Sequence, residues 1–420
     1  MSVAVTQPPP AARAAPPFAG AGAYPKSSRF TYIDALRGLA ALAVAAYHFY
    51  HSAGLMAVYD ASLPRFITAA LARGYLGVQV FFVLSGFVIA FSQRDTFVTL
   101  RYLGNFALRR SLRLDPPYWA AIFAVIALNW LAYRLHFEGL EPMPSIPVVL
   151  ANMIYIHDLI GVQKILSVSW TLCIEVQFYL ILTVLVGLVQ RLPGRRPLLG
   201  WPSPAALVVF VGLFAASLVD LVRPRIHFSV FLPHWYMFSL GAVAWWTLDG
   251  RVHRAWFWAC AGAVLALMFT VQFGRAEAVQ FDHHEFDRTA TVVCTAVSIA
   301  LVGSMGKLET LWRSRALQFF GRISYSLYLV HAIVGGKAMK LGARFLGTSP
   351  AAAVALFFVG LTVSVAGAYV FYRLIERPTV ELTKKLKRKP STLEPPTGFA
   401  GPDANGTEKA LETTTTAAPT

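Results

Sequence analysis

Arg37 and His48 are eleven positions apart in the first apolar segment of the chain, RFTYIDALRGLAALAVAAYHFYHS. Eleven helical steps of 100° make three turns plus 20°, so both side chains would lie on one face of a helix. Their separation along the axis would be roughly 16 Å at about 1.5 Å per residue. If this helix spans a membrane, Arg37 lies at one edge and His48 near the middle.

An ionisable side chain at mid-membrane depth is costly, and imidazole is suited to proton transfer near neutral pH. We therefore expect His48 to be a general base. A structural hydrogen bond to a backbone carbonyl is the alternative for His48, and His51, one turn further, could be the base instead. Asp34 precedes Arg37 by three positions, where it would orient Arg37 or form a simple capping ion pair with it.

The composition indicates that these residues belong to a membrane protein. Hydrophobic residues make up 56% of the 420 positions and charged residues 14%, against about 25% charged residues in a soluble domain. The sequence predicts an all-α polytopic bundle of about ten transmembrane helices, each near the ~20 residues that a span needs. The apolar runs cover residues 35–55, 74–92, 117–135, 171–190, 205–222, 232–248, 255–273, 289–305, 323–340 and 351–373.

The net charge of +16 is concentrated between apolar runs, which favours a topological role over nucleic-acid binding. Basic residues cluster in loops 93–116, 191–203 and 306–322 and in the run KKLKRK at 384–389. The positive-inside rule then places both termini in the cytoplasm. We predict a disordered tail at residues 1–29 and a transmembrane domain at residues 30–380. Residues 381–420 are predicted to form a second tail, which is basic at first and then disordered.

Four further polar residues fall near mid-depth or in the outer half of predicted spans, and we expect them to converge with His48. They are Ser85, Glu175, Tyr328 and His331. Glu175 could orient His48, act as the base itself, or make a structural hydrogen bond. His331 and Tyr328 could equally be structural, and Ser85-Gly86 could serve close helix packing. No metal site is expected, since the His283-His284 pair has no third ligand at suitable spacing.

Several motifs in a fixed order make the chain resemble the acyltransferase-3 family of integral membrane O-acyltransferases, in its stand-alone form. The resemblance covers about residues 30–380. The motifs are the pair Arg37 and His48, LGVQVFFVLSGFVI at 76–89, RRSLRLDPPYW at 109–119, SWTLCIEVQFYL at 169–180, GRISYSLYLVH at 321–331 and the YRLIERP that ends at Pro378.

This resemblance implies transfer of an acyl group, acetyl above all, from cytoplasmic acyl-CoA to a hydroxyl. The implied acceptor is a cell-surface or lipid-linked saccharide or a glycoside, and the implied location is a bacterial inner membrane. Arginine grips phosphate in a bidentate fashion, so the phosphates of coenzyme A would be held by a basic cluster. Its members are Arg37, Arg109, Arg110 and Arg113. The last three could instead be topology determinants only.

The catalytic roles follow from the same chemistry. His48 would take the proton of the acceptor hydroxyl, and Ser85, Tyr328 or a backbone amide near Gly86 would stabilise the oxyanion. A transporter or flippase of a saccharide or lipid precursor is the rival interpretation, because many spans with midplane polar residues also describe carriers. The expected partners are the saccharide or glycoside acceptor and the lipid bilayer, and no nucleic acid.

Overall fold

The structure is a computed structural model that describes residues 29–94, 98–135, 142–191, 204–222, 230–273 and 283–387, and the regular structure in these residues is helical throughout. Its long helices are α1 (Thr31–Tyr50), α4 (Gly77–Ser92), α5 (Leu100–Arg134), α7 (Ser169–Val189), α8 (Pro204–Val222), α9 (Trp235–Leu248), α10 (Arg254–Phe273), α11 (His283–Ser304), α12 (Arg315–His331) and α14 (Pro350–Phe371).

Shorter helices extend or connect these long ones. They are α2 (Met56–Ser62), α3 (Arg65–Ala72), α6 (Ile146–Met153), α13 (Lys337–Leu346), α15 (Arg377–Lys387), the 3₁₀ turns η1 (Gly74–Leu76) and η2 (Leu232–His234), and the π-helical turns η3 (Ala332–Gly336) and η4 (Tyr372–Glu376). Through the π-helical turns, α12 continues into α13 and α14 continues into α15.

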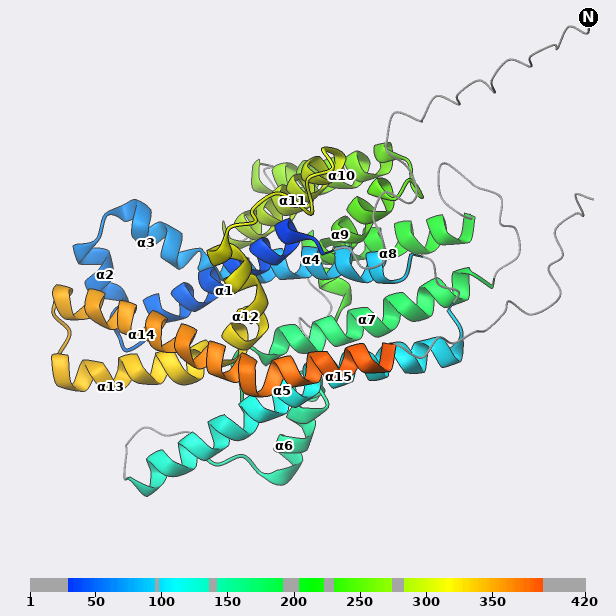
Figure 1. Cartoon of the computed structure of the whole chain (residues 1–420). Helices are drawn as coiled ribbons and strands as arrows, with labels where there is room; N and C mark the ends of the chain where they lie inside the picture. The colour runs from blue at the N-terminus through cyan, green and yellow to red at the C-terminus, as the bar shows by residue number, and fades with distance from the viewer. Residues whose placement is uncertain are drawn as a thin grey trace, which may run out of the picture.

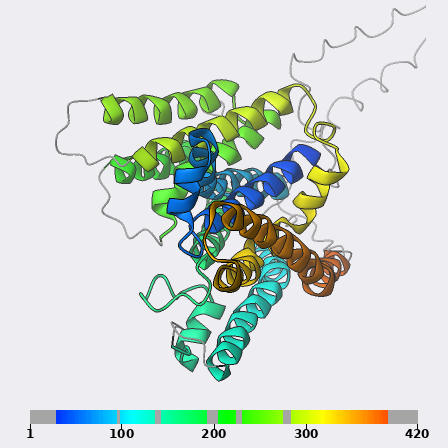
Figure 2. The same cartoon turned by 90° about the vertical axis from the view of Figure 1, so that its left-hand side faces the viewer.

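The long helices form an elongated bundle whose two ends differ (Figure 1). Helices α2 and α3 and the turn from α13 to α14 lie at the left end, whereas α5 begins and α7 ends at the right. Viewed from its left-hand side, the bundle has α1 in the middle, between the green helices of residues 204–304 and the cyan α5 (Figure 2). Residues of α1 therefore face several other helices.

Five helical stretches are long and apolar enough to cross a membrane. They are Arg65–Ser92, Ser169–Val189, Pro204–Leu221, His284–Ser304 and Pro350–Lys385. Helices occupy the other predicted ranges too, but ten crossings and cytoplasmic termini stay predictions. Most of the two predicted tails lies outside the described residues, although α15 extends beyond the predicted boundary at 380 to Lys387.

Helix α5 differs most from what the sequence suggests. Residues 93–116 read as a loop, but α5 begins at Leu100 and continues through Pro116 and Pro117. Pro116 and Pro117 cannot donate to the carbonyls of Leu112 and Arg113, four residues before them. The Tyr325 hydroxyl donates to the adjacent Leu114 carbonyl at 2.8 Å and so ties this part of α5 to α12. The helix thereby carries its arginines into the bundle instead of leaving them in a loop.

Helices α1 and α12 cross with their backbones in direct contact at two glycines. A Cβ on Gly38 would lie 2.6 Å from the backbone nitrogen of Gly321, and a Cβ on Gly321 would lie 2.4 Å from the carbonyl oxygen of Asp34. Both distances are below van der Waals contact, so only glycine fits at either position. The same device joins α4 to α9, where a Cβ on Gly86 would lie 1.9 Å from the carbonyl oxygen of Phe238.

Replacing Gly38 should test the importance of the α1–α12 crossing. Gly38→Ala is expected to lower the stability by about 1–3 kcal/mol, because the added methyl group forces the two backbones apart. The measurement is thermal unfolding of the detergent-solubilised protein. Gly104→Ala is the matched control, since a Cβ at exposed Gly104 in α5 meets nothing within 4 Å. Equal melting temperatures for the two variants would show that the crossing tolerates a side chain.

Candidate active site

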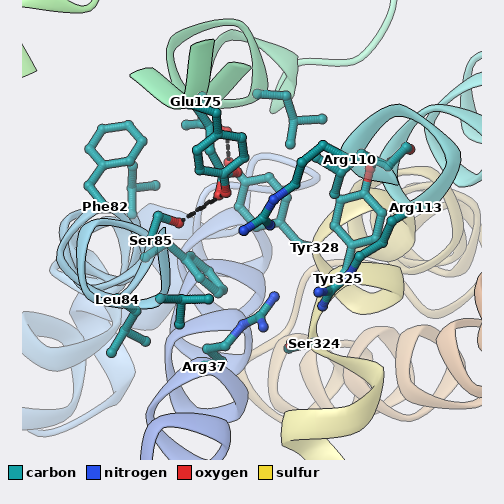
Figure 3. A pocket seen from close by; sticks show the side chains of 17 residues that line it. Arg37, Phe82, Leu84, Ser85, Arg110, Arg113, Glu175, Ser324, Tyr325 and Tyr328 are labelled. Atoms are coloured by element: carbon teal, nitrogen blue, oxygen red, sulfur yellow. Dashed lines mark hydrogen bonds between the residues drawn. The ribbon is translucent and has the colours of Figure 1, made fainter. Parts of the chain in front are cut away.

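A polar pocket lies between α1, α4, α5, α7 and α12, and three of its lining residues are arginines. We call it the arginine pocket. Figure 3 shows the side chains of Arg37, Arg110 and Arg113 directed into the same space from α1 and α5. The other polar lining residues are Ser85, Thr171, Glu175, Tyr179, Ser324, Tyr325 and Tyr328.

The arginines reach this pocket because of their positions on their helices. Arg110 and Arg113 are three residues apart in α5, so they lie on one face. The guanidinium carbon of Arg110 lies 4.6 Å from the centre of the Tyr179 ring, a cation–π contact. Arg37 is adjacent to Gly38 in the sequence. The α1–α12 contact at Gly38 therefore also determines where Arg37 lies along the bundle axis. With three cations and one carboxylate in its lining, the pocket suits an anionic ligand.

Ser85 of α4 and Glu175 of α7 form a hydrogen-bonded pair in the wall of the arginine pocket (Figure 3). The Ser85 hydroxyl donates to Oε1 of Glu175 at 2.6 Å, and the Tyr179 hydroxyl lies 3.5 Å from the Ser85 oxygen. Glu175 is thus engaged with Ser85, and this geometry gives no support to the idea that it orients His48. Gly86 packs against α9, so the backbone there serves helix packing.

A second cavity, of about 680 Å³, contains His48. We call it the histidine cavity. Aromatic and charged side chains line it together with His48 and His51, and they come from α1, η1 and α11 as well as from α4, α7, α8, η2, α9 and α12. The charged and aromatic members are Tyr47, Tyr75, Phe82, Trp170, Asp220, His234, Tyr236, His284, Glu285, Arg288 and Tyr328. Such a mixture of rings and carboxylates can bind a polar ligand with several hydroxyl groups.

His48 is held by a hydrogen-bond chain that leaves one ring nitrogen available. Nδ1 of His331 lies 3.0 Å from the carbonyl oxygen of Leu327, so we assign its proton there, which makes Nε2 an acceptor. That Nε2 lies 3.1 Å from Nδ1 of His48, which also lies 2.9 Å from the carbonyl oxygen of Val44. His48 then carries its proton on Nδ1, and its Nε2 is the nitrogen that can accept another.

The arginine pocket and the histidine cavity share a wall. Val78, Phe82 and Tyr328 line both of them. The Tyr328 hydroxyl lies 2.7 Å from Oγ1 of Thr171 and 3.3 Å from the carbonyl oxygen of Val168, which fixes the tyrosine at this boundary. The Tyr328 ring also lies 6.2 Å from that of His331, centre to centre. A ligand in either space would therefore approach the other across these three side chains.

The predicted site residues thus meet as two neighbouring pairs, Ser85 with Glu175 and His48 with His331. Tyr328 lies between the pairs. Two predicted residues lie elsewhere. The guanidinium carbon of Arg109 lies 6.0 Å from the centre of the Tyr102 ring, away from the arginine pocket, and Asp34 accepts a hydrogen bond from Arg29 at 2.8 Å.

Sequence reasoning missed some residues that the fold brings to the site. His284, considered from the sequence only as a metal ligand, lines the histidine cavity, and its Nδ1 lies 2.9 Å from the Tyr75 hydroxyl. The side chain of His283 is outside the described part.

Glu376 lines neither cavity, but it is buried near enough to Arg37 and Arg113 to interact with their charges. Its Oε2 accepts hydrogen bonds from the amide and hydroxyl of Ser326. The sequence signal that could have identified Glu376 is that it is the one acidic residue in the YRLIERP motif. Among the described residues, no group of three or more His, Cys, Asp or Glu could hold a metal ion.

Comparison with known proteins identifies the chemistry of this fold. The family described as an acyltransferase domain matches residues 30–373. The chain belongs to this acyltransferase family. The match includes both cavities and all the helices that line them, which confirms the resemblance read from the motifs and identifies the protein as an enzyme that transfers acyl groups.

Two of the three relatives described next are named as an acyltransferase or an O-acetyltransferase. Acyltransferase MdmB of Streptomyces mycarofaciens is 27% identical over 90% of this chain and 98% of its own length. Exopolysaccharide production protein ExoZ of Rhizobium meliloti is 25% identical over 73% of this chain and 89% of its own. Peptidoglycan O-acetyltransferase OatA of Listeria monocytogenes is 31% identical over 36% of this chain and 23% of its own. No solved structure matches the chain significantly.

Proposed function

We propose that this acyltransferase moves an acyl group, acetyl in the first instance, from cytoplasmic acyl-CoA to a hydroxyl of a saccharide or glycoside acceptor. The observation that carries the proposal is the wall of Val78, Phe82 and Tyr328 between two chemically different spaces. One space is cationic and suits a phosphorylated donor. The other contains a histidine with a free ring nitrogen and suits a hydroxylated acceptor.

The donor would be held by Arg37, Arg110 and Arg113. Coenzyme A carries several phosphate groups, and guanidinium groups bind phosphate through paired, charge-assisted hydrogen bonds. With the phosphates at the arginines, the pantetheine arm would extend towards Tyr328 and bring the thioester to the shared wall. Glu175, held by Ser85 at 2.6 Å, would offset part of the positive charge and keep this side of the pocket in place.

Transfer then needs one proton to move twice. Nε2 of His48 takes the proton from the acceptor hydroxyl while its oxygen attacks the thioester carbonyl carbon. The tetrahedral intermediate collapses as the carbon–sulfur bond breaks, and the departing thiolate recovers the proton from His48. His331 accepts a hydrogen bond from Nδ1 of His48 throughout, at 3.1 Å, and so stabilises the protonated ring.

The oxyanion of that intermediate would form beside Tyr328. Its hydroxyl is at the shared wall, where its proton would turn from the Val168 carbonyl to the oxyanion, whereas the Ser85 hydroxyl lines only the arginine pocket and donates to the Glu175 carboxylate. A fixed donor at this position stabilises charge that develops only in the transition state. We therefore propose Tyr328 as the main oxyanion donor and Ser85 as a positioning residue.

The acceptor class is supported by the cavity and by the names of relatives. Aromatic rings such as Trp170 and carboxylates such as Asp220 and Glu285 suit the faces and hydroxyl groups of a sugar. Two relatives are named for exopolysaccharide production and peptidoglycan O-acetylation. A cell-surface or lipid-linked saccharide is therefore the proposed acceptor.

We further propose the location and topology that this chemistry needs. The chain would cross a bacterial inner membrane about ten times within residues 30–380, with both termini in the cytoplasm. Five long apolar helices support a membrane location. The arginine pocket would then face the cytoplasmic side, and the histidine cavity, next to the α1–α2 end of the bundle, would face the opposite side.

The role of His48 can be tested by removing its imidazole. His48→Ala should reduce acyl transfer by about 10²–10⁴-fold, the usual cost of losing a general base. The readout is acylated product per mole of purified, folded protein. His51→Ala is the matched control: it lines the same cavity, and its Nδ1 lies 3.0 Å from the Tyr47 carbonyl oxygen. Near wild-type activity of His48→Ala with loss in His51→Ala would transfer the role to His51.

The arginines can be tested by steady-state kinetics with varied acyl-CoA. Arg113→Ala should raise the KM for the donor by about tenfold or more, because a charged hydrogen bond to phosphate is lost. Arg113→Lys should recover only part of it, since lysine lacks the bidentate fork. Arg109→Ala is the control, because Arg109 lies over Tyr102 outside the pocket. A donor KM that rises for Arg109→Ala and stays unchanged for Arg113→Ala would contradict this assignment.

A further inference from the structure

A second group of basic residues lines a groove on the outside of the bundle, between α12 and the continuous helix formed by α14, η4 and α15. We call it the rim groove; its volume is about 460 Å³. Its basic and tyrosine side chains are Arg322, Arg373, Arg377, Lys384, Tyr369 and Tyr372. None of the residues that line the rim groove lines the arginine pocket or the histidine cavity.

The charges in the rim groove are not balanced. Glu381 is the one carboxylate in its lining, and it accepts a hydrogen bond from Nε of Arg377 at 2.8 Å. Arg322 and Arg373 are exposed and make no ion pair with any described residue. With four cations and one paired carboxylate, the groove attracts an anion.

The groove also lies where the surface of α14 changes from apolar to charged. Val370 and Leu374 are 54% and 71% exposed, so this side of the helix is apolar without being covered by other described residues. One turn further, α15 begins at Arg377 and carries Lys384. Tyrosines at such a boundary are typical of the membrane–water interface. The groove would therefore lie at the level of the lipid head groups (α14 and α15 in Figure 1).

We infer that the rim groove binds the head group of an anionic phospholipid, with the phosphate between Arg322 and Arg373 and the acyl chains along Val370 and Leu374. Arginine pairs bind phosphate in a directed manner, and basic residues at the membrane surface attract anionic lipids. The exposed apolar side chains beside the cations single out a lipid, because a soluble phosphate compound has no chains to cover them. This site is separate from the acyl-transfer reaction.

The test uses the full-length protein in neutral detergent, titrated with phosphatidylglycerol or with phosphatidylcholine. Thermal unfolding and native mass spectrometry report stabilisation and bound lipid. Phosphatidylglycerol should raise the melting temperature of the wild-type protein, and Arg322→Gln/Arg373→Gln should need about tenfold more of it for the same rise. Arg101→Gln/Lys340→Gln, which removes two exposed charges elsewhere, should respond as the wild type does. Phosphatidylcholine should have little effect on any of them.

Two results would overturn the proposal. One is an equal response of both double variants to phosphatidylglycerol. The other is stabilisation by inorganic phosphate or coenzyme A that depends on Arg322 and Arg373, without such dependence for the lipid. If the Arg322→Gln/Arg373→Gln protein does not fold, a photoreactive phosphatidylglycerol on the wild type decides: cross-links within residues 319–323 or 369–384 support the site, and cross-links only elsewhere contradict it.

Discussion

The backbone contact between α1 and α12 is the constraint on which the site depends. Gly38 and Gly321 allow these helices to approach so closely that a Cβ at Gly38 would lie 2.6 Å from the partner backbone. This approach brings His331 to within 3.1 Å of His48. It also places Arg37 and Tyr328 in the lining of one pocket. Small residues at helix crossings are a common device in membranes, and here the device aligns the residues of two cavities.

In the proposed function, the division into two spaces lets one bundle bind two unlike substrates. A phosphorylated donor needs fixed positive charge, whereas a hydroxylated acceptor needs a base and a varied polar lining. Separate spaces let each requirement be met by different helices, α5 on one side and α11 on the other. Under this proposal only the reacting groups would have to meet, at Val78, Phe82 and Tyr328, which line both spaces.

The helical class was predictable from the apolar runs, the family from its motifs and their order, and several residues that line the two cavities from their spacing along single helices. The eleven-residue spacing of Arg37 and His48 and the i, i+3 pair Arg110 and Arg113 are such local signals. The pairing of Glu175 with Ser85, and of His48 with His331, was not predictable, since it depends on how α4, α7 and α12 rotate against their neighbours. Arg109 is a further example. It belongs to the same motif as Arg110 and Arg113, but the motif does not show which of the three side chains face the pocket.

The most direct test of the two-space account is a sided transfer measurement in proteoliposomes. Labelling of Arg101→Cys, which lies near the start of α5, defines the side on which the arginine pocket opens. Acyl-CoA is then supplied on that side alone, and a saccharide acceptor is sealed on the other. The account predicts that acylated acceptor accumulates in the compartment without donor. Transfer that occurs only when donor and acceptor share one compartment would contradict it.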